Sequence, residues 1–457
     1  MTGRELLLKA VHNETTSRPA WLPFVGAHGA RLIGRSAEDY LRSSELIVEG
    51  LQRAFDLYRP DGLPVFFDLQ LEAEVLGCEL MWALEGPPAV KTHPLERGVR
   101  LEELPVFGTD AGRFPVVLEA LRTLKKEIGN EVALYGLLCG PFTLALHLMG
   151  NDIFLRMFDH PDYVNAVLGY CVTVGRKTAR AYLEAGADVV AVVDPMTSQI
   201  SPEHFRDFVG PHVNQLFGAV RDAGGCSSLF VCGDATRNLE AMCRAECDNV
   251  SIDENIPLER LRDFTRATNK SFGGNLKLTT ALLLGDEDDA KLDAIRCIDV
   301  GGHCGFILAP GCDLPFATPE RNLQAVAEMV HDEYGREVAK RTIIAKTIES
   351  AAEIELPDYE NDPRVYVDVV TLDSASCAPC QYMMDAVNRC VARTEGTLVV
   401  QEHRITTREG ISFMRKLGVQ QIPTICIDGE IRFASLIPDQ KTLTDTFTER
   451  AREKQGR

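Results

Sequence analysis

The sequence predicts an α/β protein in which a closed barrel of parallel strands is followed by a small second α/β domain. Eight short, largely apolar segments alternate with helical patterns over residues 1–340. An acidic stretch broken by prolines, residues 341–363, interrupts this alternation and is typical of a linker. Strand and helix patterns then resume over residues 364–457. We therefore expect two domains joined by a linker.

The eight predicted strands are short and largely apolar, as buried strands of a parallel sheet are. They are Trp21–Val25, Leu63–Asp68, Val132–Leu138, Val189–Asp194, Ser228–Cys232, Asn249–Asp253, Ser271–Asn275 and Gly305–Ala309. Helical patterns precede, separate and follow them, at residues 5–12, 37–57, 113–128, 152–158, 161–185, 202–223, 238–245, 258–267, 289–300 and 319–334. Residues 73–100 are rich in Gly and Pro, and we expect them to form an excursion from the strand–helix alternation after the second strand.

This alternation predicts a TIM-type (β/α)8 barrel. The alternative is an open doubly wound sheet, but no Gly-x-Gly-x-x-Gly turn follows any of the strands.

Composition narrows the partners and the location of the protein. The net charge of -19 disfavours nucleic acids and anionic membrane surfaces as partners. No apolar run is long enough to span a bilayer, and the chain does not start with a signal-peptide core. We therefore expect a cytoplasmic protein. In that compartment fourteen cysteines do not indicate a disulfide scaffold.

Polar or thiol side chains stand at or just beyond the carboxyl ends of most predicted strands. They are His28, Asp68, His147, Asp194, Cys232, Asp253, Asn275 and Cys312. In a TIM-type barrel the working residues lie at this end. Any one of them could instead cap a helix, but their number favours an active site. We expect catalytic roles for Asp68, His147 and Asp194. We expect substrate contacts from His28, Asp253 and Asn275.

The second domain carries a Cys-x-x-Cys pair, Cys377 and Cys380, between a predicted strand and a helix. This placement is a redox signature, because the amino end of a helix stabilises the thiolate of the first cysteine. A zinc knuckle would need a second ligand pair, and Cys426, inside a predicted strand, is a poor candidate. With the Gln421-Ile-Pro423-Thr stretch, this part resembles the thioredoxin/glutaredoxin family. The resemblance implies a cis-proline at Pro423 facing the dithiol.

The barrel resembles the uroporphyrinogen decarboxylase superfamily over nearly all of residues 1–335. A colinear set of short motifs carries the resemblance. They are Arg18-Pro-Ala-Trp-Leu, Phe67-Asp68 with Glu74-Val-Leu-Gly77, Gly140-Pro-Phe-Thr-Leu, Gly186-Ala-Asp with Asp194-Pro195, Ser251-Ile-Asp253-Glu254, Gly274-Asn275-Leu and Pro310-Gly-Cys312.

Two branches of that superfamily imply different chemistry. The decarboxylases bind an eight-carboxylate porphyrinogen through arginines and an aspartate, and Asp68 stands at the aspartate position. Phe24 and His28 replace the two arginines, His147 replaces a substrate tyrosine, and Cys312 replaces a histidine. Loss of bidentate carboxylate partners makes decarboxylation of such a polyanion the weaker hypothesis.

The second branch contains the corrinoid-dependent methyltransferases of the coenzyme M and chloromethane type. Its signature is His-x-Cys after strand five and a Cys after strand eight, which together hold zinc. Cys232 and Cys312 match the two cysteines, whereas Phe230 stands where the histidine is expected. A zinc site would need a further ligand, for which the candidates are His28, His147 and Asp194. Otherwise the two cysteines are thiols without zinc, or a redox pair.

Three functions follow from these readings. The first is a methyltransferase that moves a methyl group between a cobalamin, free or on a corrinoid carrier protein, and a thiol or similar small-molecule acceptor, with zinc on Cys232 and Cys312. The second is a decarboxylase-like lyase acting on a tetrapyrrole or related acid. The third is a thiol–disulfide redox enzyme whose barrel binds a ligand. The second domain would then protect the barrel thiols, take part in turnover, or serve as a docking or dimerisation module, so a homodimer is a further expectation.

Overall fold

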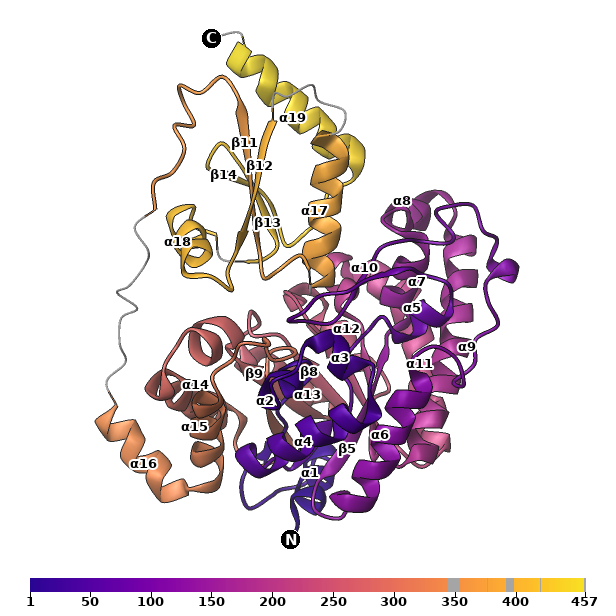
Figure 1. Ribbon diagram of the computed structural model, residues 1–457, viewed down its shortest axis with the longest axis vertical. Helices are drawn as coiled ribbons and strands as arrows, with labels where there is room; N and C mark the ends of the chain where they lie inside the picture. Colours follow the sequence, from indigo (N-terminus) through magenta and orange to yellow (C-terminus); the bar gives the residue numbers. More distant parts are fainter. Residues whose placement is uncertain (344–353, 376, 392–397, 420, 456–457) are drawn as a thin grey trace. The chain divides into compact units, whose positions relative to one another are not determined.

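The computed structural model describes residues 1–343, 354–375, 377–391, 398–419 and 421–455 (Figure 1). The chain forms two compact units. The first contains residues 1–156 and the described residues from 160 to 343. The second contains residues 157–159 and the described residues from 354 onward. Residues 344–353 of the expected linker lie outside the described residues.

The first unit is a near-closed barrel of eight parallel strands, as the alternation of strands and helices predicts. The strands are β1 (Ala20–Trp21), β2 (Gly62–Pro64), β5 (Ala133–Cys139), β6 (Val189–Val193), β7 (Cys226–Val231), β8 (Asn249–Ile252), β9 (Ser271–Leu276) and β10 (Phe306–Pro310). Their order in the sheet is β1-β10-β9-β8-β7-β6-β5-β2, and every neighbouring pair is parallel.

Asp61 links the two edge strands, β1 and β2, where the sheet closes. Its backbone N–H donates to the carbonyl of Trp21 at 2.8 Å, and its carboxylate accepts from the Trp21 N–H at 2.8 Å. Arg18 donates to the same carboxylate through both guanidinium nitrogens, at 2.6 and 2.8 Å. The strands at this seam are very short and can form few backbone hydrogen bonds with each other. The side-chain hydrogen bonds of Asp61 therefore help to join them.

Helices surround the sheet. They are α1 (Gly3–Val11), α2 (His28–Leu32), α3 (Ala37–Leu41), α4 (Ser44–Tyr58), α6 (Phe114–Glu127), α7 (Pro141–Met149), α8 (Asp152–Asp159), α9 (Pro161–Ala185), α10 (Pro202–His204), α11 (Gly210–Asp222), α12 (Leu239–Arg244), α13 (Leu258–Thr268), α14 (Glu287–Gly301), α15 (Glu320–His331) and α16 (Glu333–Thr342). None of the helices in the described part of the chain combines the length and apolar character that crossing a bilayer requires.

Three segments differ from the expectation. The predicted helix 37–57 is two helices, α3 and α4, because Ser43 caps the second through a hydrogen bond from the Leu46 N–H. The predicted helix 202–223 contains a π-helical turn, Phe205–Val209. The excursion after β2 holds the short helix α5 (Leu71–Val75) and an antiparallel hairpin of β3 (Leu80–Met81) and β4 (Ala89–Val90). Two-residue strands are too short for their alternation to be read from sequence.

The second unit has a four-stranded sheet with helices on both faces. The strands are β11 (Val365–Thr371), β12 (Leu398–Arg404), β13 (Thr424–Ile427) and β14 (Glu430–Ala434), in the order β12-β11-β13-β14. Only β11 and β12 are parallel, and β13–β14 is the predicted hairpin. Helices α17 (Ala378–Val391) and α19 (Gln440–Gln455) pack against one apolar face of the sheet, and α18 (Arg408–Lys416) against the other.

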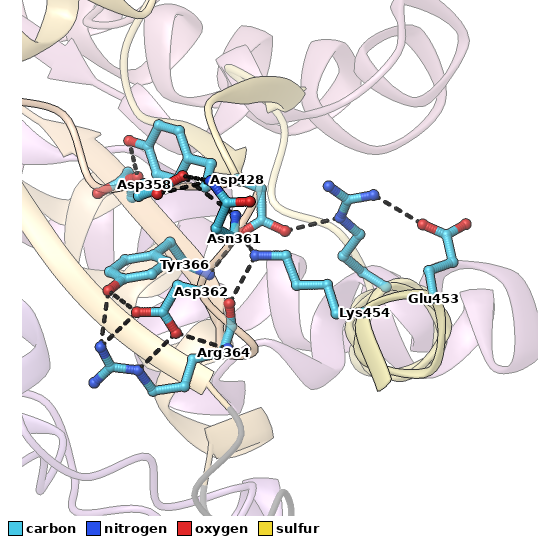
Figure 2. A network of polar contacts seen from close by, with 11 residues as sticks. Asp358, Asn361, Asp362, Arg364, Tyr366, Asp428, Glu453 and Lys454 are labelled. Carbon is cyan, nitrogen blue, oxygen red and sulfur yellow. Dashed lines mark hydrogen bonds and ion pairs between the residues drawn. The ribbon is translucent and has the colours of Figure 1, made fainter. Parts of the chain in front are cut away.

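A polar network fastens α19 to the hairpin turn of the second unit (Figure 2). The buried Asp428 carboxylate accepts hydrogen bonds from Lys454 at 2.8 Å, from Arg450 at 2.8 Å and from the Tyr366 N–H at 2.9 Å. The Lys454 side chain is 4% exposed, so its positive charge must be stabilised by partners inside the protein. These partners are the Asp428 carboxylate and the Arg364 carbonyl, to which it also donates.

Candidate functional site

Two cysteines from distant parts of the sequence meet at the carboxyl end of the barrel. Cys232 directly follows β7, and Cys312 lies two residues beyond β10. Their sulfur atoms are 2.7 Å apart. Two other strands, β8 and β9, separate β7 from β10 in the sheet. Therefore only the curvature of the closed barrel lets the two side chains meet.

Hydrogen bonds from neighbouring strand ends hold both loops. The Gly233 N–H donates to the Asp253 carboxylate at 2.9 Å, which fixes the turn after Cys232. The Gly311 N–H donates to the carbonyl of Leu276 at 2.9 Å, just before Cys312. A Cβ on Gly311 would lie 2.5 Å from the backbone nitrogen of Glu254, so only glycine permits this close approach.

The thiols pack against an aromatic cluster inside the barrel, formed by Phe24, Phe67 and Phe230. The Phe24 and Phe230 rings stack at 5.0 Å, and Phe67 lies 5.8 Å from Phe24 and 6.3 Å from Phe230. All three are buried, and both Cys232 and Cys312 pack against the same core. Phe230 therefore fills the position of the expected metal ligand with an apolar ring.

The residues present do not fit the zinc site implied by the resemblance. Protein zinc sites use three or four nitrogen, oxygen or sulfur ligands. Within the described ranges, no group of three or more His, Cys, Asp or Glu residues is placed to hold a metal ion. Two thiolates on one tetrahedral zinc lie about 3.8 Å apart when the Zn–S bonds are near 2.3 Å. The 2.7 Å between Cys232 and Cys312 is shorter than that.

Two of the proposed third ligands, His28 and Asp194, have side chains that make hydrogen bonds within the fold. His28 is fully buried and sits 3.1 Å from the Phe316 carbonyl through Nδ1 and 2.8 Å from the Tyr58 hydroxyl through Nε2. A carbonyl only accepts, so Nδ1–H donates and Nε2 accepts from Tyr58. Burial lowers the pKa of His28 to about 4, which keeps the ring neutral. In the structure the His28 ring thus joins Phe316 and Tyr58 inside the fold.

His147 and Asp194 are also fully buried. His147 lies in α7, its carbonyl accepts from His93 at 2.8 Å, and burial lowers the pKa of its ring to about 3. Asp194 accepts from the N–H groups of Phe142 and Thr143, at 3.1 and 2.8 Å, and from the Thr143 hydroxyl at 2.6 Å. It therefore holds the first turn of α7, although burial raises its pKa to about 6.

Asp68 belongs to a buried ionic cluster. Its carboxylate accepts from Arg113 at 2.7 Å and from the Gln70 N–H at 2.8 Å. Arg113 also donates to Glu74 at 2.7 Å, and its guanidinium lies over the Trp82 ring, 4.8 Å from the centroid. This cluster ties the excursion after β2 to α6. Arg113 was not among the predicted site residues, although a buried Asp68 requires a counter-charge.

Asp253 and Asn275 connect adjacent strand ends. Besides Gly233, Asp253 accepts from the Asn255 N–H at 2.9 Å. The Asn275 amide donates to the carbonyls of Asp253 and Ile256, at 3.1 and 2.6 Å. Asn275 is 1% exposed. Asp253 thus positions the loop that carries Cys232, whereas Asn275 holds the loop after β8, and burial raises the pKa of Asp253.

In the second unit, Cys377 immediately precedes α17 and is half-buried, whereas Cys380 in the first turn is fully buried. The Cys380 sulfur accepts from the Leu372 N–H at 3.4 Å. Glu402, which the sequence did not single out, accepts from the Thr371 hydroxyl at 2.6 Å and from the Ser374 N–H at 3.0 Å. It thereby braces the loop before Cys377. The Ile422–Pro423 bond is cis, as the resemblance implies.

Comparisons with known proteins agree with this architecture. The family profile of uroporphyrinogen decarboxylase (URO-D) matches residues 2–333. The methylcobamide:CoM methyltransferase MtbA of Methanosarcina acetivorans is 29% identical over 271 residues, which cover 59% of this chain and 78% of that protein. A uroporphyrinogen decarboxylase of Carboxydothermus hydrogenoformans is 26% identical over 348 residues, covering 72% and 96%.

Among solved structures, a methyltransferase from Methanosarcina mazei superposes with a TM-score of 0.67 at 25% identity. The match covers 73% of this chain and 99% of that one. Barrel relatives thus include both methyltransferases and decarboxylases. With the profile spanning the barrel from end to end, this chain belongs to the uroporphyrinogen decarboxylase family.

Proposed function

We propose that this protein transfers a methyl group between a corrinoid and a thiol or similar acceptor at the carboxyl end of its barrel. The observation that carries the proposal is the meeting of Cys232 and Cys312, at 2.7 Å, where the methyltransferase branch places its two cysteines. The relative MtbA, named a methylcobamide:CoM methyltransferase, supports the same reading. The corrinoid is a co-substrate, either free cobalamin or one carried by a partner protein.

The chain's own residues shape the place of transfer. Phe24, Phe67 and Phe230 form a dry apolar floor, which excludes water from a reacting thiolate. Asp253 holds the turn after Cys232, and Asn275 in turn donates to the Asp253 carbonyl. When bound, the corrinoid supplies the methyl group. A thiol acceptor attacks that methyl carbon as its thiolate, so the acceptor must first release its proton.

No step of this proposal passes through zinc, because the ligand set is incomplete. An acceptor thiol that is not bound to zinc keeps its ordinary pKa of about 8.5. Transfer should therefore accelerate as the pH rises toward that value. A rate that is already maximal well below it would contradict the zinc-free reading.

For the second unit, we propose a thioredoxin-like fold with thiol–disulfide activity. Its β12-β11-β13-β14 sheet with one parallel pair supports this proposal. So does the position of Cys377 at the amino end of α17. Cys377 would be the attacking thiolate and Cys380 the resolving thiol.

The transfer is tested with the full chain, methylcobalamin and two thiols, anionic 2-mercaptoethanesulfonate and neutral 2-mercaptoethanol, under reducing conditions. The expected result is loss of the methyl–cobalt absorbance and formation of the methyl thioether. Cys232→Ala, which breaks the thiol pair that lines the proposed site, should lower the rate of the reaction. Cys304→Ala is the matched control, because this exposed thiol precedes β10 at its opposite end. Methylcobalamin left intact with both thiols would contradict the proposal for free cobalamin and these acceptors.

The decarboxylase-like lyase remains a second candidate because Asp68 is retained and decarboxylases are among the relatives. Against it, Asp68 already accepts from Arg113 and Gln70, and Phe24 and His28 stand in place of arginines. Release of CO₂ from uroporphyrinogen would establish that function instead. In the third hypothesis, disulfide reduction is the main activity. Reduction of a disulfide substrate that requires only Cys377 and Cys380 would support it.

A further inference from the structure

We propose that Cys232 and Cys312 form a reversible disulfide, which gives the barrel a redox centre of its own. A disulfide bond is about 2.05 Å long. The two sulfur atoms, at 2.7 Å, need to approach by only a fraction of an ångström. The inference depends on this geometry alone and holds whether or not the barrel transfers methyl groups.

The surroundings of the pair favour its oxidation. The turn after Cys232 is held by Asp253, and the chain before Cys312 by the Leu276 carbonyl, so the thiols stay close without a metal. Fixed proximity of this kind gives the second thiol a high effective concentration. Both cysteines are half-buried, not fully enclosed, so a small disulfide can reach them. The apolar side chains against which the two cysteines pack include no metal ligand that could replace one of the two sulfur atoms.

The same two strands provide an internal comparison. Cys226 begins β7, and Cys304 lies just before β10, at the ends opposite to Cys232 and Cys312. Cys226 lies 3.8 Å from His12, and the Cys304 thiol donates to the carbonyl of Asn13 at 3.5 Å. These two thiols thus belong to the same strands but contact other groups. Replacing these two cysteines therefore controls for the loss of two thiols from the same strands without separating Cys232 from Cys312.

The proposed step is a balanced thiol–disulfide exchange. The thiolate of one barrel cysteine attacks a small disulfide, forms a mixed disulfide and releases one thiolate, which takes up a proton. The second barrel thiolate then attacks the barrel sulfur of the mixed disulfide, and the second small thiol leaves. Two electrons pass from the barrel pair to the oxidant. A dithiol reverses the reaction and becomes a disulfide itself. The Cys377 and Cys380 pair, from the same or another molecule, belongs to that chemical class.

The test equilibrates the folded full chain with mixtures of reduced and oxidised glutathione, from fully reducing to fully oxidising. Samples are quenched with acid, remaining thiols are alkylated, and digests are analysed by mass spectrometry. The expected result is a Cys232–Cys312 cross-linked peptide that forms and disappears reversibly as a two-electron couple. The Cys226→Ser/Cys304→Ser variant should cross-link as the wild type does. Cys232→Ser should leave Cys312 alkylated or bound to glutathione.

Two results would overturn the inference. One is full alkylation of Cys232 and Cys312 in the most oxidising mixture, while Cys377 and Cys380 in the same sample become cross-linked. The other is about one zinc per chain that is lost in Cys232→Ala and that prevents cross-linking of the wild type. Because the readout is covalent, its failure is separate from a failure of methyl transfer.

Discussion

The carboxylate of Asp253 accepts a hydrogen bond from the backbone N–H of Gly233 at 2.9 Å, so the end of β8 holds the turn that carries Cys232. Asp253→Ala removes this acceptor and should loosen the turn. A hydrogen bond to a charged group contributes about 1.5–3 kcal/mol, so the equilibrium constant for the Cys232–Cys312 disulfide should fall roughly tenfold or more. Glutathione titration measures it. Asp253→Asn keeps an acceptor oxygen and should retain most of the wild-type value.

Phe230 separates this barrel from a zinc-binding one. Phe230→His places an imidazole two residues before Cys232, which completes a set of one nitrogen and two sulfur ligands. We expect the reduced variant to bind zinc at about one ion per chain, and bound zinc to slow disulfide formation between Cys232 and Cys312. Metal analysis and alkylation rates check both outcomes. Phe24→His, on the other side of the ring stack, serves as the control and should not gain stoichiometric zinc.

Arg113 is the shared cation of the Asp68 and Glu74 carboxylates, and it is 5% exposed. Arg113→Met leaves the buried Asp68 charge without its partner, which should destabilise the barrel by about 3–5 kcal/mol. Both tryptophans, Trp21 and Trp82, lie in the barrel, so tryptophan fluorescence during urea unfolding reports on this unit.

The control for that substitution is Arg100→Met. Arg100 pairs with Glu102 and Glu103 at the surface, where all three side chains are largely exposed. Its loss should hardly change the unfolding midpoint. Equal effects of the two substitutions would contradict a special role of the buried cluster.

We expect Glu72 to make the stability of the barrel depend on pH. Burial raises the pKa of its carboxyl group to about 8, far above the value of about 4.5 in an unfolded chain. The folded state therefore binds more protons than the unfolded state between these two values. As a result, stability should decrease as the pH rises from about 4.5 to about 8. Glu72→Gln should flatten part of this decline, and unfolding midpoints at pH 6 and pH 9 measure it. An identical decline in both proteins would rule out Glu72 as its source.

Asp428 should control the stability of the second unit in the same way that Arg113 controls the barrel. Asp428→Ala leaves the buried Lys454 charge without its carboxylate, at an expected cost of about 3–5 kcal/mol. Hydrogen exchange of β11 and α19 should accelerate accordingly. Arg364→Ala, at the exposed rim of the network in Figure 2, should change exchange little. Protection that stays unchanged in Asp428→Ala would contradict the network's role.

Local patterns were sufficient for most of the fold. The eight barrel strands are found within a few residues of their predicted positions, because buried parallel strands are continuous apolar runs between helical periods. Prediction was least accurate where few local residues specify an element. The hairpin of β3 and β4 and the π-helical turn before α11 are examples. The Asp61 contacts at the barrel seam likewise depend on residues distant in sequence.

For the site, the sequence by itself determined that Cys232 and Cys312 belong at the same end of the barrel, because both follow strands of a parallel sheet. The resemblance also predicted that Phe230 stands where a ligand histidine is expected. Only the tertiary structure decided that the two sulfur atoms touch, that Phe24, Phe67 and Phe230 close over one another, and that Asp194 and His28 are engaged elsewhere. Strand order places a residue at an edge, whereas partners and distances follow from sheet curvature and packing, which no local pattern encodes.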